Sequence, residues 1–251
     1  MSEGSEGKKK FKTIAIVAGS IIVVAALATL TWSTVLGGDG EDVDPASTAG
    51  LSTAAEEARS IYDGVAAEGN FLGEMDAPLE LIEFSSLDCE PCAVYHEKTL
   101  PRVLEEYVVP GDMRLDLELL VPEGSEHVQL ATEAASALSF DNRIWQFADT
   151  FYRDRTDNPE GEPTAEYLEE LATKLDLVYE PDFDNVGEDE LVIRAKERAN
   201  ALADEWTIDR AALPQFLVGP LGGPYEVLDA DPTDPDGFLD ALAEVTGRYG
   251  F

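Results

Sequence analysis

Two cysteines, Cys89 and Cys92, are the only ones in the 251-residue chain, and two residues separate them. This spacing is compatible with thiol–disulfide exchange, metal binding or a structural disulfide. A zinc site would need further ligands, and the chain has only two histidines, His96 and His127. A disulfide this short would close too small a loop to stabilise a fold much. The spacing therefore favours a redox-active pair over a metal site or an inert bridge.

The residues around the pair are those expected where a strand runs into a helix. An apolar run from Leu79 to Phe84 is followed by a short Ser/Asp turn. Pro91 suits a first helical turn, where its missing N–H costs nothing. Because a helix N-terminus carries partial positive charge and free N–H groups, it would stabilise a thiolate at Cys89.

Hydrophobic spacing predicts the elements that position this junction. Residues 51–65 repeat at helical spacing, and residues 69–73 could form a short strand. We expect a central strand over 79–84 and then one helix, bent at Pro101 rather than divided. Strict alternation over 113–119 predicts a second strand. Strand, helix and strand form a βαβ unit, so the two strands should be parallel.

The rest of the chain divides into a helical part and a final mixed part. Between Glu126 and Trp206 the spacing predicts four helices and no strand, with loops near 154–163 and 180–187. Short strands are expected at 215–218 and 225–228, joined as a hairpin by a Gly-Gly-Pro turn. An amphipathic helix that begins near Asp234 closes the chain.

Two stretches together resemble the DsbA-like branch of the thioredoxin superfamily. The first is GNFLGEMDAPLELIEFSSLDCEPCAVYHEKTLPRVLEEY, residues 69–107. The second is ALPQFLVG, residues 212–219, which looks like the landmark in which a cis-proline opens a strand. The helical segment between them matches that branch in position and length. The resemblance implies an α/β thioredoxin fold that carries an all-helical insertion.

The resemblance also implies roles for individual residues. Cys89 would be the nucleophile that forms a mixed disulfide with substrate, and Cys92 would resolve it, so that the two form the Cys89–Cys92 disulfide. Glu83 matches the family's buried acid, and burial should raise its pKa and make it a proton acceptor for Cys92. Pro214 would be the cis-proline that faces the cysteines. Glu83 could instead be an acid that faces solvent or pairs with an arginine, and Pro214 could be an ordinary trans proline.

Three more residues would lie beside the substrate: Leu213, Glu90 and Pro91. The family often has Thr or Val where this chain has Leu213, which affects substrate release and redox tuning. The negative charge of Glu90 should raise the pKa of Cys89 against the helix dipole, which predicts a potential more reducing than the strongest oxidants of this kind. We interpret His96 as a helix-surface or domain-interface residue rather than a catalyst. No metal and no cofactor is expected.

The amino terminus predicts a membrane anchor. A polar start ends in the basic cluster Lys8–Lys12, and residues 13–36 are apolar and free of charge, long enough to span a bilayer. A cleaved signal peptide is the alternative, but its apolar region would be shorter. Basic residues on the amino side predict a cytoplasmic N-terminus and an extracytoplasmic carboxyl-terminal part, where a disulfide can persist.

The chain therefore divides into six expected segments. They are a basic cytoplasmic tail (1–12), a transmembrane anchor (13–36), a flexible linker rich in Gly, Asp and Ser (37–50), the first part of the thioredoxin-like domain (51–125), the helical insertion (126–206) and the second part of the domain (207–251).

The net charge limits the possible partners. With 17 basic and 52 acidic residues the formal charge is −35, which argues against binding nucleic acid or anionic lipid headgroups. The acidic residues are dispersed, which is typical either of a host that lives at high salt or simply of an acidic secreted protein.

The most direct interpretation is a single-pass membrane protein of the cell membrane with thiol–disulfide oxidoreductase activity. Its expected partners are extracytoplasmic proteins with cysteines, a membrane redox partner that recycles the cysteine pair, and the lipid bilayer through residues 13–36. The alternative is a non-catalytic thioredoxin-like binding module that holds peptides or delivers a metal through Cys89, Cys92 and His96.

Overall fold

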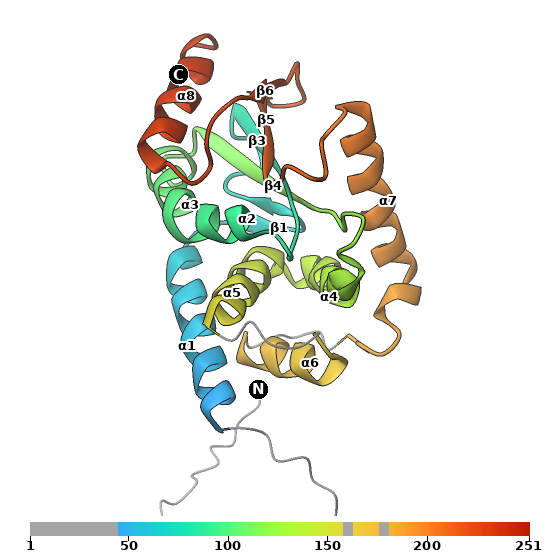
Figure 1. Ribbon diagram of the computed structural model, residues 1–251. Coiled ribbons are helices and arrows are strands. Elements are labelled where there is room, and N and C mark those ends of the chain that lie inside the picture. The colour runs from blue at the N-terminus through green and yellow to red at the C-terminus, as the bar shows by residue number, and fades with distance from the viewer. Residues whose placement is uncertain (1–44, 158–162, 176–180) are drawn as a thin grey trace, which may run out of the picture. The chain divides into compact units, whose positions relative to one another are not determined.

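The computed structural model describes residues 45–157, 163–175 and 181–251, and Figure 1 shows their arrangement. The basic tail (1–12) and the membrane anchor (13–36) predicted above lie outside the described residues, as does most of the linker (37–50). Within the described ranges, no helix is both long and apolar enough to cross a bilayer.

A six-stranded mixed sheet lies at the centre of the described fold, in the order β1-β2-β4-β3-β5-β6. β3 pairs with β4 in parallel, as predicted for the βαβ unit, and all other pairings are antiparallel. All seven residues of β3 are buried, including the polar Glu80, Glu83 and Ser85, as expected for a central strand that is covered on both faces. The strands are β1 (Ala67–Glu68), β2 (Phe71–Leu72), β3 (Leu79–Ser85), β4 (Met113–Leu119), β5 (Gln215–Pro220) and β6 (Glu226–Leu228).

One continuous helical segment joins β3 to β4, as predicted. It consists of α2 (Glu90–Val94), the π-type turn η1 (Tyr95–Thr99), α3 (Leu100–Val103) and a second π-type turn, η2 (Leu104–Val108). The N–H of Leu100 donates to the carbonyl of Tyr95, five residues earlier. This wider turn directly precedes Pro101, which has no N–H to donate, so the helix continues through the proline.

The predicted helical insertion is confirmed: among the described residues of 126–206 there is no strand. One loop prediction was wrong at its start, because α5 continues to Asp157 rather than ending near residue 154. Near this point a contact ties α5 to the next helix: the hydroxyl of Tyr167 in α6 donates to Asp154 at 2.8 Å. The insertion contains η3 (Glu126–Val128), α4 (Gln129–Leu138), η4 (Ser139–Asp141), α5 (Ile144–Asp157), α6 (Ala165–Lys174), η5 (Val186–Glu188) and α7 (Glu190–Glu205).

Two boundaries near the start of the domain differ from the prediction. α1 (Pro45–Tyr62) begins inside the expected linker, and its proline lies in the first turn, where no N–H is missed. The single strand expected over 69–73 is instead the end of a β1–β2 hairpin. Gly69, with φ +62°, lies in the turn, a conformation that glycine adopts without steric cost.

The helices cover both faces of the sheet (Figure 1). The segment from α2 to η2 packs on one face together with α8 (Pro235–Gly247), the predicted closing helix, and α7 packs against the other. α1 lies along α5 and also contacts α6.

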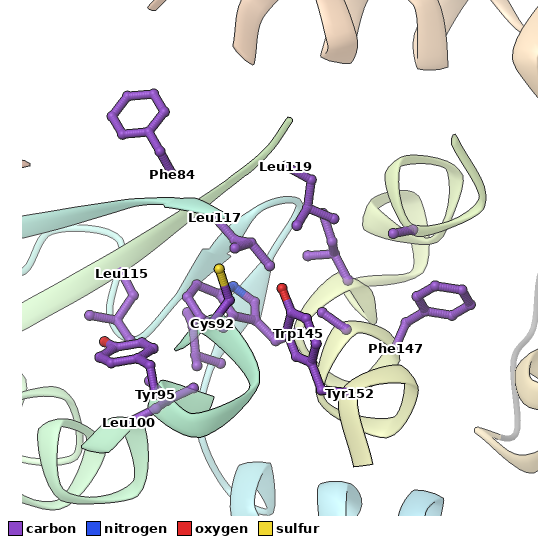
Figure 2. Close-up of a cluster of buried hydrophobic side chains, with 14 of the residues drawn as sticks. Phe84, Cys92, Tyr95, Leu100, Leu115, Leu117, Leu119, Trp145, Phe147 and Tyr152 are labelled. Atoms are coloured by element: carbon purple, nitrogen blue, oxygen red, sulfur yellow. The ribbon is translucent and has the colours of Figure 1, made fainter. Parts of the chain in front are cut away.

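The main hydrophobic core of the described residues joins the sheet to the insertion (Figure 2). Cys92, Tyr95 and Leu100 reach into it from the helical segment after β3, and Trp145, Phe147 and Tyr152 reach into it from α5. The Trp145 indole N–H also donates to the carbonyl of Asn70 at 2.8 Å. Because the helices of the insertion share this core, α5 has a fixed position beside the helix that follows the cysteines.

Candidate active site

The cysteine pair lies at the junction of β3 and α2, and the two sulfurs are bonded to each other. Cys89 is the N-cap residue of α2, with extended backbone angles (φ −115°, ψ 107°), and Pro91 lies in the first turn. The backbone N–H of Cys92 donates to Sγ of Cys89 at 3.1 Å. In the reduced protein this N–H and the helix N-terminus would both stabilise a thiolate at Cys89.

The two cysteines differ sharply in exposure. Cys89 is half-buried, whereas Cys92 has a relative exposure of 0% and belongs to the hydrophobic core. An incoming thiolate can therefore reach Cys89 from outside and cannot reach Cys92. This asymmetry permits a sequence of attack at Cys89 and resolution by Cys92.

The second landmark faces the first. The Leu213–Pro214 peptide bond is cis, the isomer that the resemblance implies, and β5 begins at the next residue. The carbonyl oxygen of Leu213 lies 3.2 Å from Sγ of Cys89, although 124 residues separate them in sequence. The backbone just before β5 therefore forms one wall beside the half-buried sulfur.

Gln215 fixes this wall, a role that the sequence did not indicate. Its side-chain amide donates to the carbonyl of Asp209 at 2.8 Å and to that of Ala212 at 3.2 Å. The loop before the cis-proline is thereby tied to the start of β5. Nothing in the sequence around Gln215 indicates these contacts.

A surface hollow of about 340 Å³ surrounds Cys89. The structure brings together there all three residues predicted to lie beside a substrate, and its lining includes Cys89, Glu90, Pro91, Leu213, Glu123 and Arg210. Backbone groups beside such a hollow can pair with an extended peptide segment. The carboxylates of Glu90 and Glu123 give its rim an acidic character.

The residue before Cys89 links the cysteine turn to the insertion. Asp88 accepts a hydrogen bond from the Ser125 hydroxyl at 2.9 Å and pairs with Nε2 of His127 at 3.1 Å. These contacts hold the turn from the insertion side. Sequence reasoning missed them, because nothing local connects Asp88 to residues almost 40 positions later.

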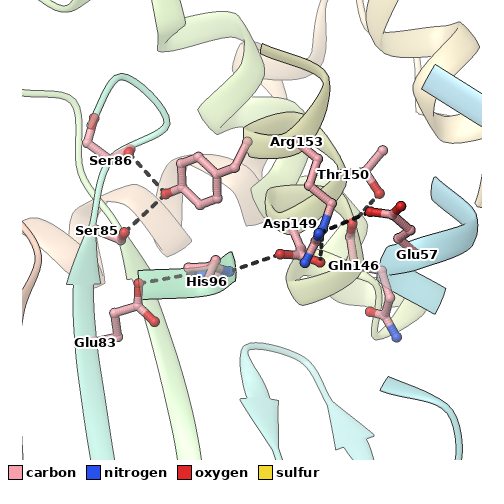
Figure 3. Close-up of polar contacts among 10 residues, drawn as sticks. Glu57, Glu83, Ser85, Ser86, His96, Gln146, Asp149, Thr150 and Arg153 are labelled. Atoms are coloured by element: carbon pink, nitrogen blue, oxygen red, sulfur yellow. Dashed lines mark hydrogen bonds and ion pairs between the residues drawn. The ribbon is translucent and has the colours of Figure 1, made fainter. Parts of the chain in front are cut away.

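Glu83 lies inside the fold, on β3, with 1% relative exposure. Its Oε1 atom is 3.1 Å from Nε2 of His96, one helical turn beyond Cys92 (Figure 3). Glu83 therefore faces neither solvent nor an arginine. His96, expected at a helix surface or a domain interface, is 1% exposed and lies between β3 and α5, so the surface alternative was wrong.

The metal-binding alternative finds no support in this geometry. His96 Nε2 is directed at Glu83, and no group of three histidine, cysteine or acidic side chains in the described ranges is placed to hold a metal ion. The arrangement at Cys89 and Cys92 suits the exchange of a disulfide with an external thiol.

Comparison with known proteins agrees with the fold and the site. A family profile described as thioredoxin matches residues 66–211, more than half of the chain. A probable disulfide bond formation protein D from Bacillus anthracis is 29% identical over 112 residues, 42% of this chain and 51% of that protein. One of the same description from Bacillus cereus is 27% identical over 138 residues, 52% of this chain and 63% of that protein. The chain thus spans about half to two thirds of the length of these curated relatives.

Solved structures of low sequence identity share the architecture. Oxidised BdbD from Bacillus subtilis superposes with a TM-score of 0.59 at 19% identity, and the match covers 73% of this chain and 98% of that one. DsbA from Chlamydia trachomatis gives 0.51 at 16% identity, with 72% and 92% covered. On the family match, the cysteine pair and this shared fold, the chain belongs to the thioredoxin family.

Proposed function

We propose that the protein is a thiol–disulfide oxidoreductase that exchanges disulfides with protein substrates through Cys89 and Cys92. The observation that carries the proposal is the asymmetry of the pair: a half-buried Cys89 at a helix start, beside the Leu213 carbonyl, is bonded to a fully buried Cys92. The relatives named for disulfide bond formation support the same activity.

The exchange proceeds in two balanced steps when the protein acts as an oxidant. A substrate thiolate attacks Sγ of Cys89, a substrate–Cys89 disulfide forms, and the electron pair of the broken bond goes to Cys92. A second substrate thiolate then attacks the substrate sulfur of that disulfide, and Cys89 leaves as a thiolate. The substrate has gained one disulfide, and the protein holds two reduced cysteines. The same steps in reverse reduce a substrate disulfide.

Glu83 supports the buried cysteine in this scheme. Cys92 changes between disulfide, thiolate and thiol inside an apolar core, where an unpaired charge is costly. A buried carboxyl beneath the active-site helix can give Cys92 a proton when its thiolate is released, and can take the proton when Cys92 must attack. We assign Glu83 this proton-exchange role.

We further propose that the domain acts outside the cytoplasm, tethered by residues 13–36. The apolar, uncharged character of that stretch and the lysines before it support this placement. Its partners would be extracytoplasmic proteins that carry cysteines and a membrane protein that restores the redox state of the pair. A disulfide between Cys89 and Cys92 is compatible with an oxidising compartment.

A refolding assay tests the activity. The purified protein is added to a reduced, unfolded protein that needs disulfides for activity, in a glutathione buffer, and insulin reduction is measured in parallel. We expect wild type to accelerate one of the two reactions at least tenfold, and Cys89→Ser to abolish the effect while leaving the thermal unfolding cooperative. Acceleration that survives in Cys89→Ser would contradict the proposal.

A further inference from the structure

A line of buried polar groups runs from β3 to α5 beneath the active-site helix (Figure 3). Glu83 Oε1 lies 3.1 Å from Nε2 of His96, and Nδ1 of His96 lies 3.8 Å from Oδ1 of Asp149. All three residues have at most 1% relative exposure. The imidazole therefore bridges two carboxylates that come from different elements of the fold.

Each member of this line has a polar atom with no hydrogen-bond partner among the described residues. These atoms are Glu83 Oε2, His96 Nδ1 and Asp149 Oδ1. A buried unsatisfied polar atom costs about 1–3 kcal/mol, so three in one row are not explained by stability. A row of neighbouring titratable groups can pass a proton from one to the next.

One end of the line lies near Cys92 in the chain, and the other lies at a surface hollow. At one end, His96 follows Cys92 by four residues on the same helical segment, so both lie on the same face. At the other end, Asp149 lines a surface hollow of about 250 Å³. There Arg153 donates to Asp149 at 3.0 Å and pairs with Glu57 of α1 at 3.1 Å. The line thus runs from the helical segment that carries the buried cysteine to a surface hollow.

The groups around His96 favour its protonated form. Burial lowers its pKa, but the nearby Glu83 carboxylate, which also accepts its hydrogen bond, and then Asp149 outweigh burial and raise the pKa above its ordinary value. Arg153 opposes them weakly. The titratable and charged groups that face this site from every packed element are Glu83 on β3, Asp149, Tyr152 and Arg153 on α5, Glu57 and Tyr62 on α1, and Tyr95 on its own helix.

We propose that His96 and Asp149 form a proton path between Glu83 and the solvent-filled hollow, with His96 losing a proton to the hollow when Glu83 takes the proton of Cys92 in each reaction cycle. This inference rests on the proposed function. His96 does not touch the substrate: it is a positioning residue that acts on Cys92 through Glu83.

The path balances when Cys92 attacks a mixed disulfide at Cys89. The S–H bond of Cys92 breaks and its proton goes to Glu83, while a new S–S bond to Cys89 forms and the outside thiolate leaves with the electron pair. His96 passes a proton from Nδ1 to Asp149, which releases it into the hollow. His96 is left neutral with its one proton on Nε2, and Glu83 keeps the proton from Cys92. When the Cys92 thiolate is next released, Glu83 returns that proton to it, and a proton from the hollow reaches Nδ1 through Asp149, which restores the starting state.

The reagent dithiobis(nitrobenzoate) separates the two cysteines in one experiment. Cys89 of the reduced protein attacks the reagent and releases one coloured thiolate, at a rate proportional to reagent concentration. Cys92 then attacks the mixed disulfide and releases the second, at a rate independent of reagent concentration. The first release serves as an internal control for Cys89, and the second reports proton loss from Cys92.

The first variant, His96→Gln, keeps a neutral hydrogen-bond donor toward Glu83. The second, Asp149→Asn, removes the negative charge at the solvent end of the line and keeps the shape of the side chain. Asp154→Asn is the matched control, because Asp154 is a buried acid of the same helix that binds Tyr167 rather than His96. If His96→Gln does not fold, Asp149→Asn alone carries the test.

We expect the second release to slow about tenfold at pH 6–7 in both variants, and the first release and the Asp154→Asn control to be unchanged. The difference between the variants and wild type should become smaller as the pH rises, because a thiol then loses its proton more readily without help from a neighbouring acceptor. Unshifted pH profiles, or the same slowing at every pH, would overturn the proton path. A wild type that gives no second release would instead contradict the proposed function itself.

Discussion

Cys89 and Cys92 are chemically identical residues to which the fold gives different reactivities. Cys89 caps a helix, accepts the N–H of Cys92 and borders a surface hollow, whereas Cys92 is enclosed by the core. The difference decides which sulfur meets the substrate. It also means that charges on the rim act mainly on Cys89.

Glu90, the exposed acid between the cysteines, should therefore tune the redox potential. In Glu90→Gln the Cys89 thiolate loses a negative neighbour, so the reduced form is stabilised and the protein becomes a stronger oxidant. We expect the equilibrium constant with glutathione to shift on the order of twofold toward the reduced protein. Glu105→Gln, an exposed acid further along the same helical segment, is the matched control and should not change it. A more reducing redox potential in Glu90→Gln would refute the inference that the charge of Glu90 destabilises the Cys89 thiolate.

The residues of the site that could be predicted from sequence are those with local signals. A cysteine pair after an apolar run, an acid within that run and a proline before a later strand are all visible as patterns. The contacts of Gln215 with its loop, and of Asp88 with Ser125 and His127, depend on segments that meet only in the folded chain. His96 was visible, but its burial follows from the position of α5, which no pattern in its own helix indicates.

Among the elements, α7 is attached to the sheet by charge as well as by apolar contacts. Arg198 of α7 pairs with Asp116 and Glu118, two acids of β4 with 2% and 1% relative exposure. Burial raises the pKa of both, and beside Asp116 the pKa of Glu118 rises to about 9. One arginine thus compensates two acids that would otherwise be unfavourable between sheet and helix.

Arg198→Ala should consequently destabilise the protein by about 2–3 kcal/mol at neutral pH, because an acid that is ionised at this site loses its counter-charge; the effect is smaller than for a fully buried pair because Arg198 is half-exposed. These acids have raised folded-state pKa values, so their ionisation opposes folding as the pH rises. The substitution should therefore lower the free energy of unfolding more at pH 9 than at pH 5, where the acids bind protons. Chemical denaturation at both pH values measures it.

Arg194→Ala is the control for this change. Arg194 lies one turn earlier in α7 and pairs only with an exposed acid, Glu190, so its loss should cost less than about 0.5 kcal/mol. Equal effects of the two substitutions, or no dependence on pH for Arg198→Ala, would show that the buried pairs do not hold α7 in place.

Element types were largely predictable because their periodicity is strong. The βαβ unit, the helical insertion, the closing hairpin and α8 all follow from apolar spacing. The boundaries were less predictable for physical reasons that sequence does not display. A tertiary hydrogen bond from Tyr167 ties α5 to α6 at the point where a loop was expected, and Gly69 turns an expected strand into a hairpin.

At the scale of the whole molecule, the main feature is a formal charge of −35. Acidic side chains are dispersed along the chain, so they repel one another at low ionic strength. Screening shortens the range of this repulsion from about 10 Å at 0.1 M salt to about 3 Å at 1 M. Concentrated salt would therefore relieve much of this repulsion.

Molar salt should therefore stabilise the protein. We expect the unfolding temperature to rise on the order of 5–10 °C between 0.1 and 2 M KCl, or about 2–3 kcal/mol. Sucrose, which stabilises proteins by exclusion without screening, separates this electrostatic effect from a general solvent effect. An unfolding temperature that does not change with KCl would contradict adaptation to salt.

The most direct test of the central claim, that Cys89 meets the substrate and Cys92 resolves it, is a comparison of trapped mixed disulfides. Cys92→Ala and Cys89→Ala are each produced in the native host, and covalent adducts that a reductant releases are counted and identified. The account predicts abundant protein adducts on Cys92→Ala, because the half-buried sulfur remains and nothing resolves its disulfide, and very few on Cys89→Ala. Equal adducts on the two variants, or none on Cys92→Ala, would contradict it.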